Sequence, residues 1–203
     1  MEQTNQQIEV VFFDIGGVLS APAVSFTYET MVGEGKEIDK SEYRKLMHEW
    51  RLLTGKQGTL KNLIEDQYLH LGLNHEGLLE VFGRLPIYEE NLALVERLRE
   101  GKIKTGIISD QFAESAQSLR ERISRFNLLF NPVIFSHESG LTKLTKEIFE
   151  VVAGEIKINP LNLLMVDDNY DNIMSAESAG WNILHYNHST DSLEDGLRSY
   201  GLL

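Results

Sequence analysis

Side chains that carry oxygen close three apolar runs of the sequence, each at the point where the run ends. They are Asp14, the pair Ser109 and Asp110, and the pair Asp167 and Asp168. Carboxylates that gather at one place repel one another, and a hard divalent cation such as Mg2+ is the simplest way to neutralise them. If the fold brings these residues together, their types predict a magnesium site with a hydroxyl group beside it.

The apolar runs have the length and composition of buried β-strands. They cover residues 8–14, 104–110, 132–136 and 163–168, with 181–186 as a fifth. Helical patterns lie between most of them, at 112–126, 144–156 and 169–180. Strands that alternate with helices predict a parallel α/β sheet with helices on both faces. Ligands of such sheets bind at the carboxyl ends of the strands, where the oxygen-bearing side chains fall.

The segment from about residue 22 to 88 has a different pattern, with helical stretches and no convincing strand. A helix predicted at 89–101 then returns the chain to the sheet. An insertion of this length is too long for an ordinary strand-to-helix connection, and such insertions usually have a task such as covering a site. We therefore expect an α/β core formed by residues 1–21 and 88–203, and a small all-helical domain formed by residues 22–87.

Each candidate residue has a purely structural interpretation when it stands alone. One Asp at a strand end most often caps a helix or forms a turn, and an isolated Ser109 or Lys143 carries little information. The pair Asp167 and Asp168 is harder to explain structurally, because Asp is depleted in strands and adjacent like charges are unfavourable. The functional interpretation therefore rests on the ordered combination.

That combination resembles the haloacid dehalogenase (HAD) superfamily, whose members are mostly phosphatases, and the resemblance covers nearly the whole chain in family order. It is carried by FFDIGGVL (12–19), IISD (107–110), SGLTKLTKEIF (139–149) and LLMVDDNYDNIMSAESAG (163–180). The last segment is specific, because it combines an apolar strand, an Asp pair, an Asn four residues after the second Asp and a helix of small residues. The resemblance implies a Rossmann-like core, with the inserted segment as an alpha-helical cap of the C1 type.

The resemblance also implies a role for each residue. Asp14 would attack phosphorus to form an aspartyl-phosphate that water later hydrolyses, with Mg2+ screening the two anions. Lys143 and the Ser109 hydroxyl would stabilise the developing charge. The implied phosphate-binding residues are Gly17, Ser109, Asp110 and Lys143, and the implied metal ligands are Asp14, Gly16, Asp167 and Asp168.

Gly16 departs from the family pattern. Phosphatases of the superfamily usually have a second Asp two residues after the nucleophile, whose carbonyl ligates Mg2+ and whose side chain is the general acid and base. Glycine keeps the carbonyl and lacks the acid, a group typically worth about 10²–10⁴-fold in rate. Gly17 matches a family glycine that lets the backbone turn tightly near the phosphate. Asp110 stands where the family more often has Asn, and it adds negative charge near the phosphate.

Three interpretations remain open. The protein is a phosphatase whose substrate has a good leaving group, such as an acyl or anomeric phosphate, or whose acid comes from elsewhere, with Asp110, Glu49 and His48 as candidates. It is a dehalogenase or phosphonatase, although a dehalogenase needs no metal and fits the Asp pair poorly. It is a non-catalytic relative that binds a phosphorylated ligand or a protein. The resemblance favours a Mg2+-dependent phosphatase acting on a small phosphorylated metabolite.

The composition excludes several other classes of protein. Nineteen basic and thirty-one acidic residues give a net charge of -12, and no Lys/Arg run provides the surface that nucleic-acid binding requires. The absence of Cys excludes disulfides, thiol catalysis and Cys-based metal sites. No apolar stretch approaches the roughly 18 residues of a membrane span, and the polar start is unlike a signal peptide. We expect a cytoplasmic monomer or homodimer with no membrane partner.

Overall fold

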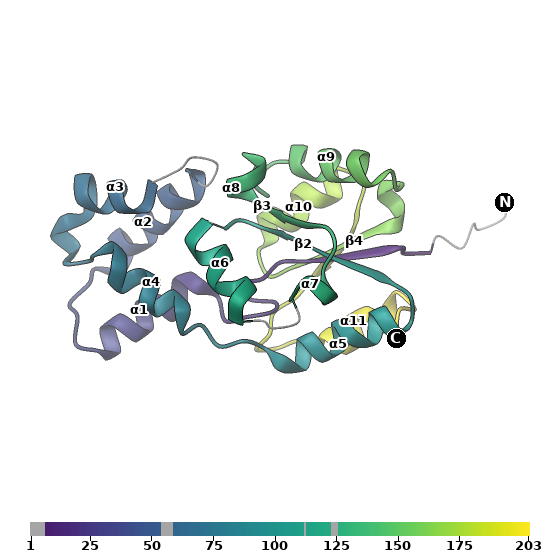
Figure 1. Ribbon diagram of the computed structural model, residues 1–203, viewed down its shortest axis with the longest axis horizontal. Helices are drawn as coiled ribbons and strands as arrows, with labels where there is room; N and C mark the ends of the chain where they lie inside the picture. Colours follow the sequence, from purple (N-terminus) through teal and green to yellow (C-terminus); the bar gives the residue numbers. More distant parts are fainter. Residues whose placement is uncertain (1–6, 54–58, 112, 123–125) are drawn as a thin grey trace.

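A parallel sheet forms the centre of the molecule. The computed structural model describes residues 7–53, 59–111, 113–122 and 126–203, and within these ranges five strands follow the order β3-β2-β1-β4-β5 (Figure 1). The strands are β1 (Val10–Phe13), β2 (Lys104–Ser109), β3 (Val133–Phe135), β4 (Leu163–Asp167) and β5 (Asn182–His185). All five predicted strands are present, and the predicted Rossmann-like α/β fold is confirmed.

The central strand β1 explains why its sequence is apolar at every position. It pairs in parallel with β2 on one side and with β4 on the other. Val11 and Phe13 pack into the apolar cluster on one face of the sheet, while Val10 and Phe12 pack into the cluster on the opposite face. Because both faces are covered, β1 shows a continuous hydrophobic run and no alternation with polar residues.

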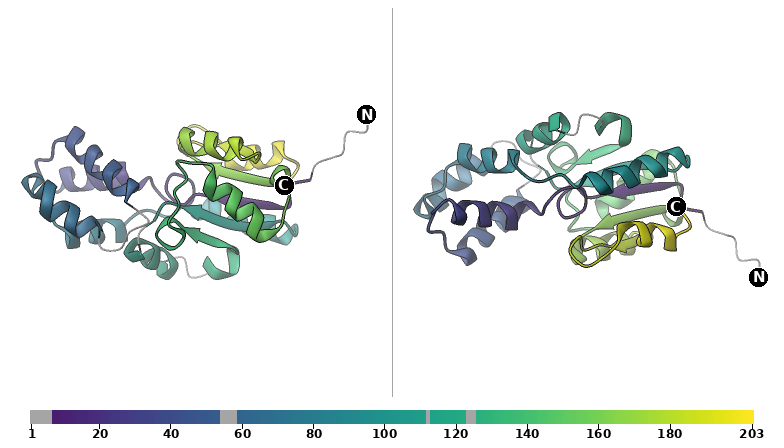
Figure 2. Two further views of the ribbon diagram at one scale, coloured as in Figure 1. Left: turned by 90° about the horizontal axis from the view of Figure 1, so that it is seen from above. Right: turned by 90° about the horizontal axis from the view of Figure 1, so that it is seen from below.

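Helices cover the two faces of the sheet as separate layers (Figures 1 and 2). One face packs against α5 (Glu89–Glu100), α7 (Phe126–Leu129) and α11 (Leu193–Ser199), together with residues of α6 (Ala113–Arg122). The other face packs against α9 (Glu147–Ile156) and α10 (Tyr170–Ser178). The short helix α8 (Ser136–Ser139) precedes the loop that leads to α9, and the short helix η3 (Pro160–Asn162) directly precedes β4.

Two of the predicted helices have different limits in the structure. The helix predicted at 112–126 appears as α6, and residues 112 and 123–125 lie outside the described residues. The helix predicted at 144–156 begins only at Glu147, after a turn. Its first residues instead belong to the loop that positions Lys143.

The segment between β1 and α5 forms a helical lobe, a name we use for residues 23–83 (Figure 1). It contains α1 (Ala23–Gly33), α2 (Lys40–Leu52), α3 (Thr59–Leu63), the π-helical turn η1 (Ile64–Tyr68), η2 (Leu69–Leu71) and α4 (His75–Gly83). The lobe has an apolar cluster of its own, which includes Tyr43, Leu46 and Leu78. The domain limits expected from the sequence, 1–21 with 88–203 and 22–87, stay a prediction.

The chain enters and leaves the lobe through two adjacent segments. Ala21 N donates to Pro86 O at 2.9 Å, and Tyr88 N donates to Leu19 O at 2.9 Å. Asn91 on α5 adds a third link, since its Nδ2 donates to Val18 O at 2.6 Å. These bonds fix the base of the lobe beside the end of β1. None of the helices in the described ranges has both the length and the apolar character of a membrane-spanning helix.

Candidate active site

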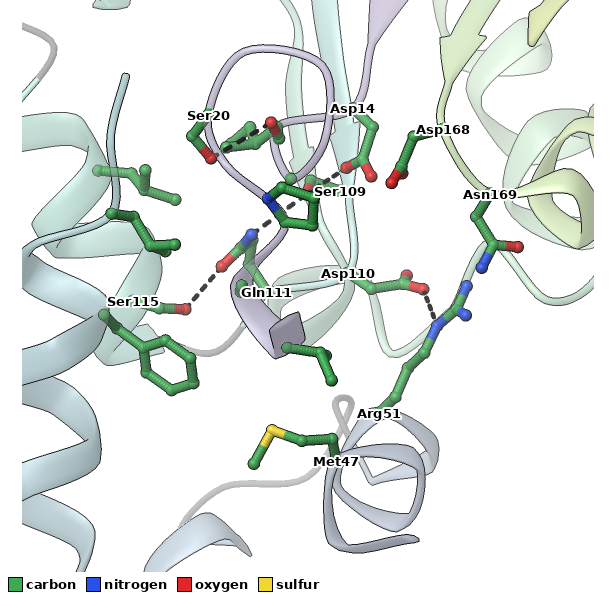
Figure 3. Close-up of a pocket in the computed structure, with 18 of the residues that line it drawn as sticks. Asp14, Ser20, Met47, Arg51, Ser109, Asp110, Gln111, Ser115, Asp168 and Asn169 are labelled. Atoms are coloured by element: carbon green, nitrogen blue, oxygen red, sulfur yellow. Dashed lines mark hydrogen bonds and ion pairs between the residues drawn. The ribbon is translucent and has the colours of Figure 1, made fainter. Parts of the chain in front are cut away.

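Asp14 directly follows β1 and continues the ladder toward β4. Its backbone N–H donates to Val166 O at 2.9 Å, which holds the residue at the carboxyl edge of the sheet. The neighbouring strand β2 brings Ser109 alongside, and the Ser109 hydroxyl donates to Asp14 Oδ1 at 2.7 Å (Figure 3). The Asp14 residue is only 8% exposed. The predicted meeting of Asp14 with Ser109 is therefore present in the structure.

Lys143 reaches the same carboxylate from the loop before α9. Its Nζ lies 2.8 Å from Asp14 Oδ1 and 2.6 Å from Asp167 Oδ2, and the residue is 1% exposed. Burial by itself favours the neutral amine, but the charges of Asp14 and Asp167 outweigh it and raise the pKa of Lys143 above its ordinary value. Lys143 is therefore a buried cation held between two carboxylates.

Three carboxylates lie close enough together to share one cation. Oxygen atoms of Asp14, Asp167 and Asp168 all lie within 4.8 Å of one another. Burial, together with the charges of Asp14 and Asp167, raises the pKa of Asp168 to about 7. Burial likewise raises the pKa of Asp167 to about 6, although Lys143 opposes the shift. Asp167 and Asp168 thus resist ionisation, and the hard oxygen atoms of the three residues lie together in a way that fits a divalent cation such as Mg2+.

Gly17 is required by the position of Asp168. Its φ of +78° lies in the left-handed region, and a Cβ built on it would lie 2.2 Å from Asp168 Oδ2. Gly16 differs, because a Cβ there would meet nothing closer than Ala23 N at 4.0 Å. The place where the family usually has its second Asp therefore has room for a Cβ.

A cavity of about 340 Å³ lies between the helical lobe and the ends of the strands. The core contributes polar residues, including Asp14, Ser109 and Asp168. The lobe contributes Met47, Trp50, Arg51 and Phe82. Trp50 and Phe82 stack with ring centroids 5.1 Å apart. The polar residues of the core thus face a largely apolar wall (Figure 3).

Only one of the candidate replacements for the missing acid lines this cavity. Asp110 does so, but its Oδ2 accepts from Arg51 Nε at 3.0 Å and its Oδ1 accepts from Lys143 N at 3.1 Å. Both carboxylate oxygens of Asp110 thus already accept hydrogen bonds from the protein. His48 and Glu49 are both among the described residues, and neither lines the cavity.

The sequence did not assign roles to three residues that the structure brings to the site. Gln111 Nε2 donates to Ser109 Oγ at 3.3 Å. Asn172 Nδ2 lies 3.0 Å from both carboxylate oxygens of Asp167. Arg51 bonds to Asp110 and to Asn172 Oδ1. The spacing of Asn172 from Asp168 is part of the fourth motif and could have indicated it, whereas nothing in the sequence of α2 distinguishes Arg51.

Solved structures share this fold. A HAD family enzyme of Bacteroides thetaiotaomicron matches with a TM-score of 0.75 and 18% identity, covering 93% of this chain and 98% of that one. An Asp-to-Ala variant of that enzyme, solved with magnesium and inorganic phosphate, matches with a TM-score of 0.74, 18% identity and coverages of 92% and 98%. The L-2-haloacid dehalogenase of Xanthobacter autotrophicus matches with a TM-score of 0.67, 20% identity and coverages of 93% and 80%.

No curated protein matches the sequence. Residues 8–180 match the family described as haloacid dehalogenase-like hydrolase, and this range contains β1 to β4 and every residue of the site described above. The chain therefore belongs to the haloacid dehalogenase-like hydrolases.

Proposed function

We propose that this hydrolase is a Mg2+-dependent phosphatase that acts on a small phosphorylated metabolite through a phosphoenzyme formed on Asp14. One observation carries the proposal. The buried carboxylate of Asp14 accepts from the Ser109 hydroxyl and from the Lys143 ammonium group, and Asp168 lies beside it. These contacts support a role for Asp14 as nucleophile, for Ser109 and Lys143 as donors to phosphoryl oxygens, and for the carboxylates as metal ligands.

The side chains of the site divide the work of phosphoryl transfer. Ser109 and Lys143 both contact Oδ1 of Asp14, so they orient the carboxylate before substrate arrives. The same two groups would donate to the phosphoryl oxygens as negative charge develops on them. Asp14, Asp168 and the carbonyl of Gly16 would hold Mg2+, helped by Asp167, and the bound ion would screen the carboxylate from the phosphate.

The leaving group must depart with little help from a general acid. Gly16 supplies none, and Asp110 is bound to Arg51. A substrate whose leaving group is stable as an anion or departs readily, such as an acyl or anomeric phosphate, would suit this site best. The wall formed by Met47, Trp50 and Phe82 favours a leaving group that buries some apolar surface. The helical lobe would act as the cap that excludes bulk water.

The test is phosphate release from a panel of acyl, sugar, aryl and alkyl phosphates, with Mg2+ or with EDTA. We expect release by the wild type only in Mg2+, and none by Asp14→Asn, which keeps the shape of the side chain and cannot form the phosphoenzyme. Asp195→Asn, an exposed acid on α11, is the matched control and should retain full activity.

Two results would contradict the proposal. One is phosphate release that survives both EDTA and the Asp14→Asn substitution. The other is no release from any substrate by a protein that binds Mg2+ and inorganic phosphate, which would favour a binding role. A 2-haloacid is included in the panel, because halide release without metal would instead identify a dehalogenase.

A further inference from the structure

Arg51 is a residue of the helical lobe whose guanidinium group reaches the core. It lies near the end of α2, and its Nε donates to Asp110 Oδ2 at 3.0 Å (Figure 3). Its Nη2 donates to Asn172 Oδ1 on α10. One side chain of the lobe therefore joins two separate elements of the core, the end of β2 and the start of α10.

Both core partners of Arg51 form hydrogen bonds to residues of the candidate active site. Asp110 Oδ1 accepts from the backbone N–H of Lys143 at 3.1 Å. Asn172 Nδ2 donates to Asp167, which in turn accepts from Lys143 Nζ at 2.6 Å. The hydrogen bonds form a closed ring that runs from Arg51 through Asp110, Lys143, Asp167 and Asn172. The position of the lysine is thus tied on two sides to the position of Arg51.

The formal charges of the site give Arg51 a second role. The carboxylates of Asp14, Asp110, Asp167 and Asp168 face the ammonium of Lys143 and the guanidinium of Arg51, and within the described ranges these two are the cationic side chains that line the cavity. The formal balance is minus two, which a single Mg2+ would neutralise. Without Arg51 the negative charge of Asp110 would lose its ion-pair partner. An anion that enters the cavity would then be repelled by Asp110.

We propose that Arg51 is a positioning residue that makes anion binding at the catalytic site depend on the helical lobe. With the lobe in the described position, Arg51 neutralises Asp110 and holds Asn172 against Asp167. With Arg51 withdrawn, Asp110 repels the anion and Asn172 loses the partner of its carbonyl. The identity of the anion as phosphate rests on the proposed function, whereas the dependence on Arg51 rests on the ring of contacts.

The experiment compares Arg51→Met, Asp110→Asn and the double variant with the wild type. The probe is inorganic phosphate, titrated calorimetrically in saturating Mg2+. We expect Arg51→Met to weaken phosphate binding by about tenfold or more, and Asp110→Asn to restore most of the loss in the double variant, because the charge that Arg51 neutralises is then absent. Arg84→Met, which removes an exposed ion pair with Glu34 of the lobe, is the control and should change nothing.

Arg51→Lys tests the ring separately from the charge. A lysine keeps the positive charge near Asp110, but it lacks the planar fork that contacts Asp110 and Asn172 together. We expect this variant to retain phosphate affinity within about threefold and to lower kcat more than it changes KM. If Arg51→Met lowers the melting temperature too far for a binding experiment, Arg51→Lys is the variant used to test the role of the ring.

The outcomes separate this inference from the proposed function. If Asp110→Asn rescues phosphate binding while no substrate is turned over, the phosphatase fails and the role of Arg51 stands. If turnover is present but Arg51→Met binds phosphate as the wild type does, or if the double variant is as weak as Arg51→Met, the role of Arg51 is wrong. A wild type that binds no phosphate in Mg2+ also overturns it.

Discussion

The two walls of the cavity are built in opposite ways. On the core wall, Lys143 contacts two carboxylates, and Asp167 accepts from Lys143, from Asn172 and from the backbone N–H of Asn169. On the lobe wall, the side chains of Met47 and Phe82 are apolar and belong to the lobe's own cluster. The core wall therefore suits bond making and breaking, and the lobe wall suits the choice of substrate.

The two walls also differ in how firmly their residues are placed. Asp14 and Ser109 stand at the ends of paired strands, so the ladder of the sheet fixes their relative position. Met47 stands on a helix whose packing partners lie in the lobe. Substitutions on the core wall should therefore affect catalysis most, and substitutions of the apolar side chains on the lobe wall should affect mainly substrate selection. Five predictions test the two walls.

Gly17→Ala should damage the core wall most. The added Cβ would lie 2.2 Å from Asp168 Oδ2, so Asp168 or the turn at Gly17 must shift from its present place. We expect a loss of about 10²-fold in kcat/KM and weaker Mg2+ binding, because a displacement of this kind is costly in a preorganised site. Gly35→Ala is the control, since its φ of +87° brings similar backbone strain with no atom within 4 Å. Equal losses of activity in the two variants would contradict the prediction.

Gly16→Asp should improve the core wall for difficult substrates. A Cβ at this position would meet no atom closer than 4.0 Å, and a carboxyl group here would supply the missing general acid. We expect turnover of alkyl phosphates, which have poor leaving groups, to rise by about tenfold or more, with little change for acyl phosphates. Gly16→Asn has the same size and cannot transfer the proton. A similar gain in both variants would show that size and not acidity matters.

The affinity for Mg2+ should rise with pH. Asp168 and Asp167 have pKa values raised by burial to about 7 and about 6, so metal binding must displace protons below these values. We expect the affinity to increase by up to about tenfold per pH unit for each proton displaced. Calorimetry in two buffers of different ionisation enthalpy would count the protons. An affinity that is constant between about pH 5 and pH 7 would contradict the assignment.

The same shifts predict how the metal-free protein responds to pH. A carboxyl group whose pKa is raised in the fold keeps a proton that the unfolded chain has lost. Stability without metal should therefore fall as pH rises from about 4 to about 7, and the increase in melting temperature caused by Mg2+ should grow over the same range.

Phe82→Leu should have the smallest effect on activity. It removes one partner of the stack with Trp50 on the lobe wall. We expect the KM for aryl phosphates to rise by about threefold, with little change in kcat. Phe149→Leu removes an aromatic partner of Trp181 in the core and should leave KM unchanged. A kcat that falls more for Phe82→Leu than for Gly17→Ala would reverse the assignment of the two walls.

The sequence predicted the core wall well and the lobe wall poorly, for a physical reason. Asp14, Ser109 and Asp168 follow apolar strands, and the geometry of a parallel sheet brings all such ends to one edge. Arg51 and Asp110 meet although 59 residues separate them, and no local pattern reports how a lobe packs on a core. The helix α11 was also missed, because it is short and only Leu193 and Leu197 are buried.

The bonds between residues 19–21 and 86–88 place the start and the end of the lobe side by side. A segment whose two ends meet can be exchanged as a cassette, because all five strands of the sheet lie outside it. A short turn in place of residues 22–85 would leave the catalytic edge in the open, and a helical lobe from another hydrolase would give the same edge a new substrate. The choice of substrate and the chemistry could then evolve at different rates within one chain.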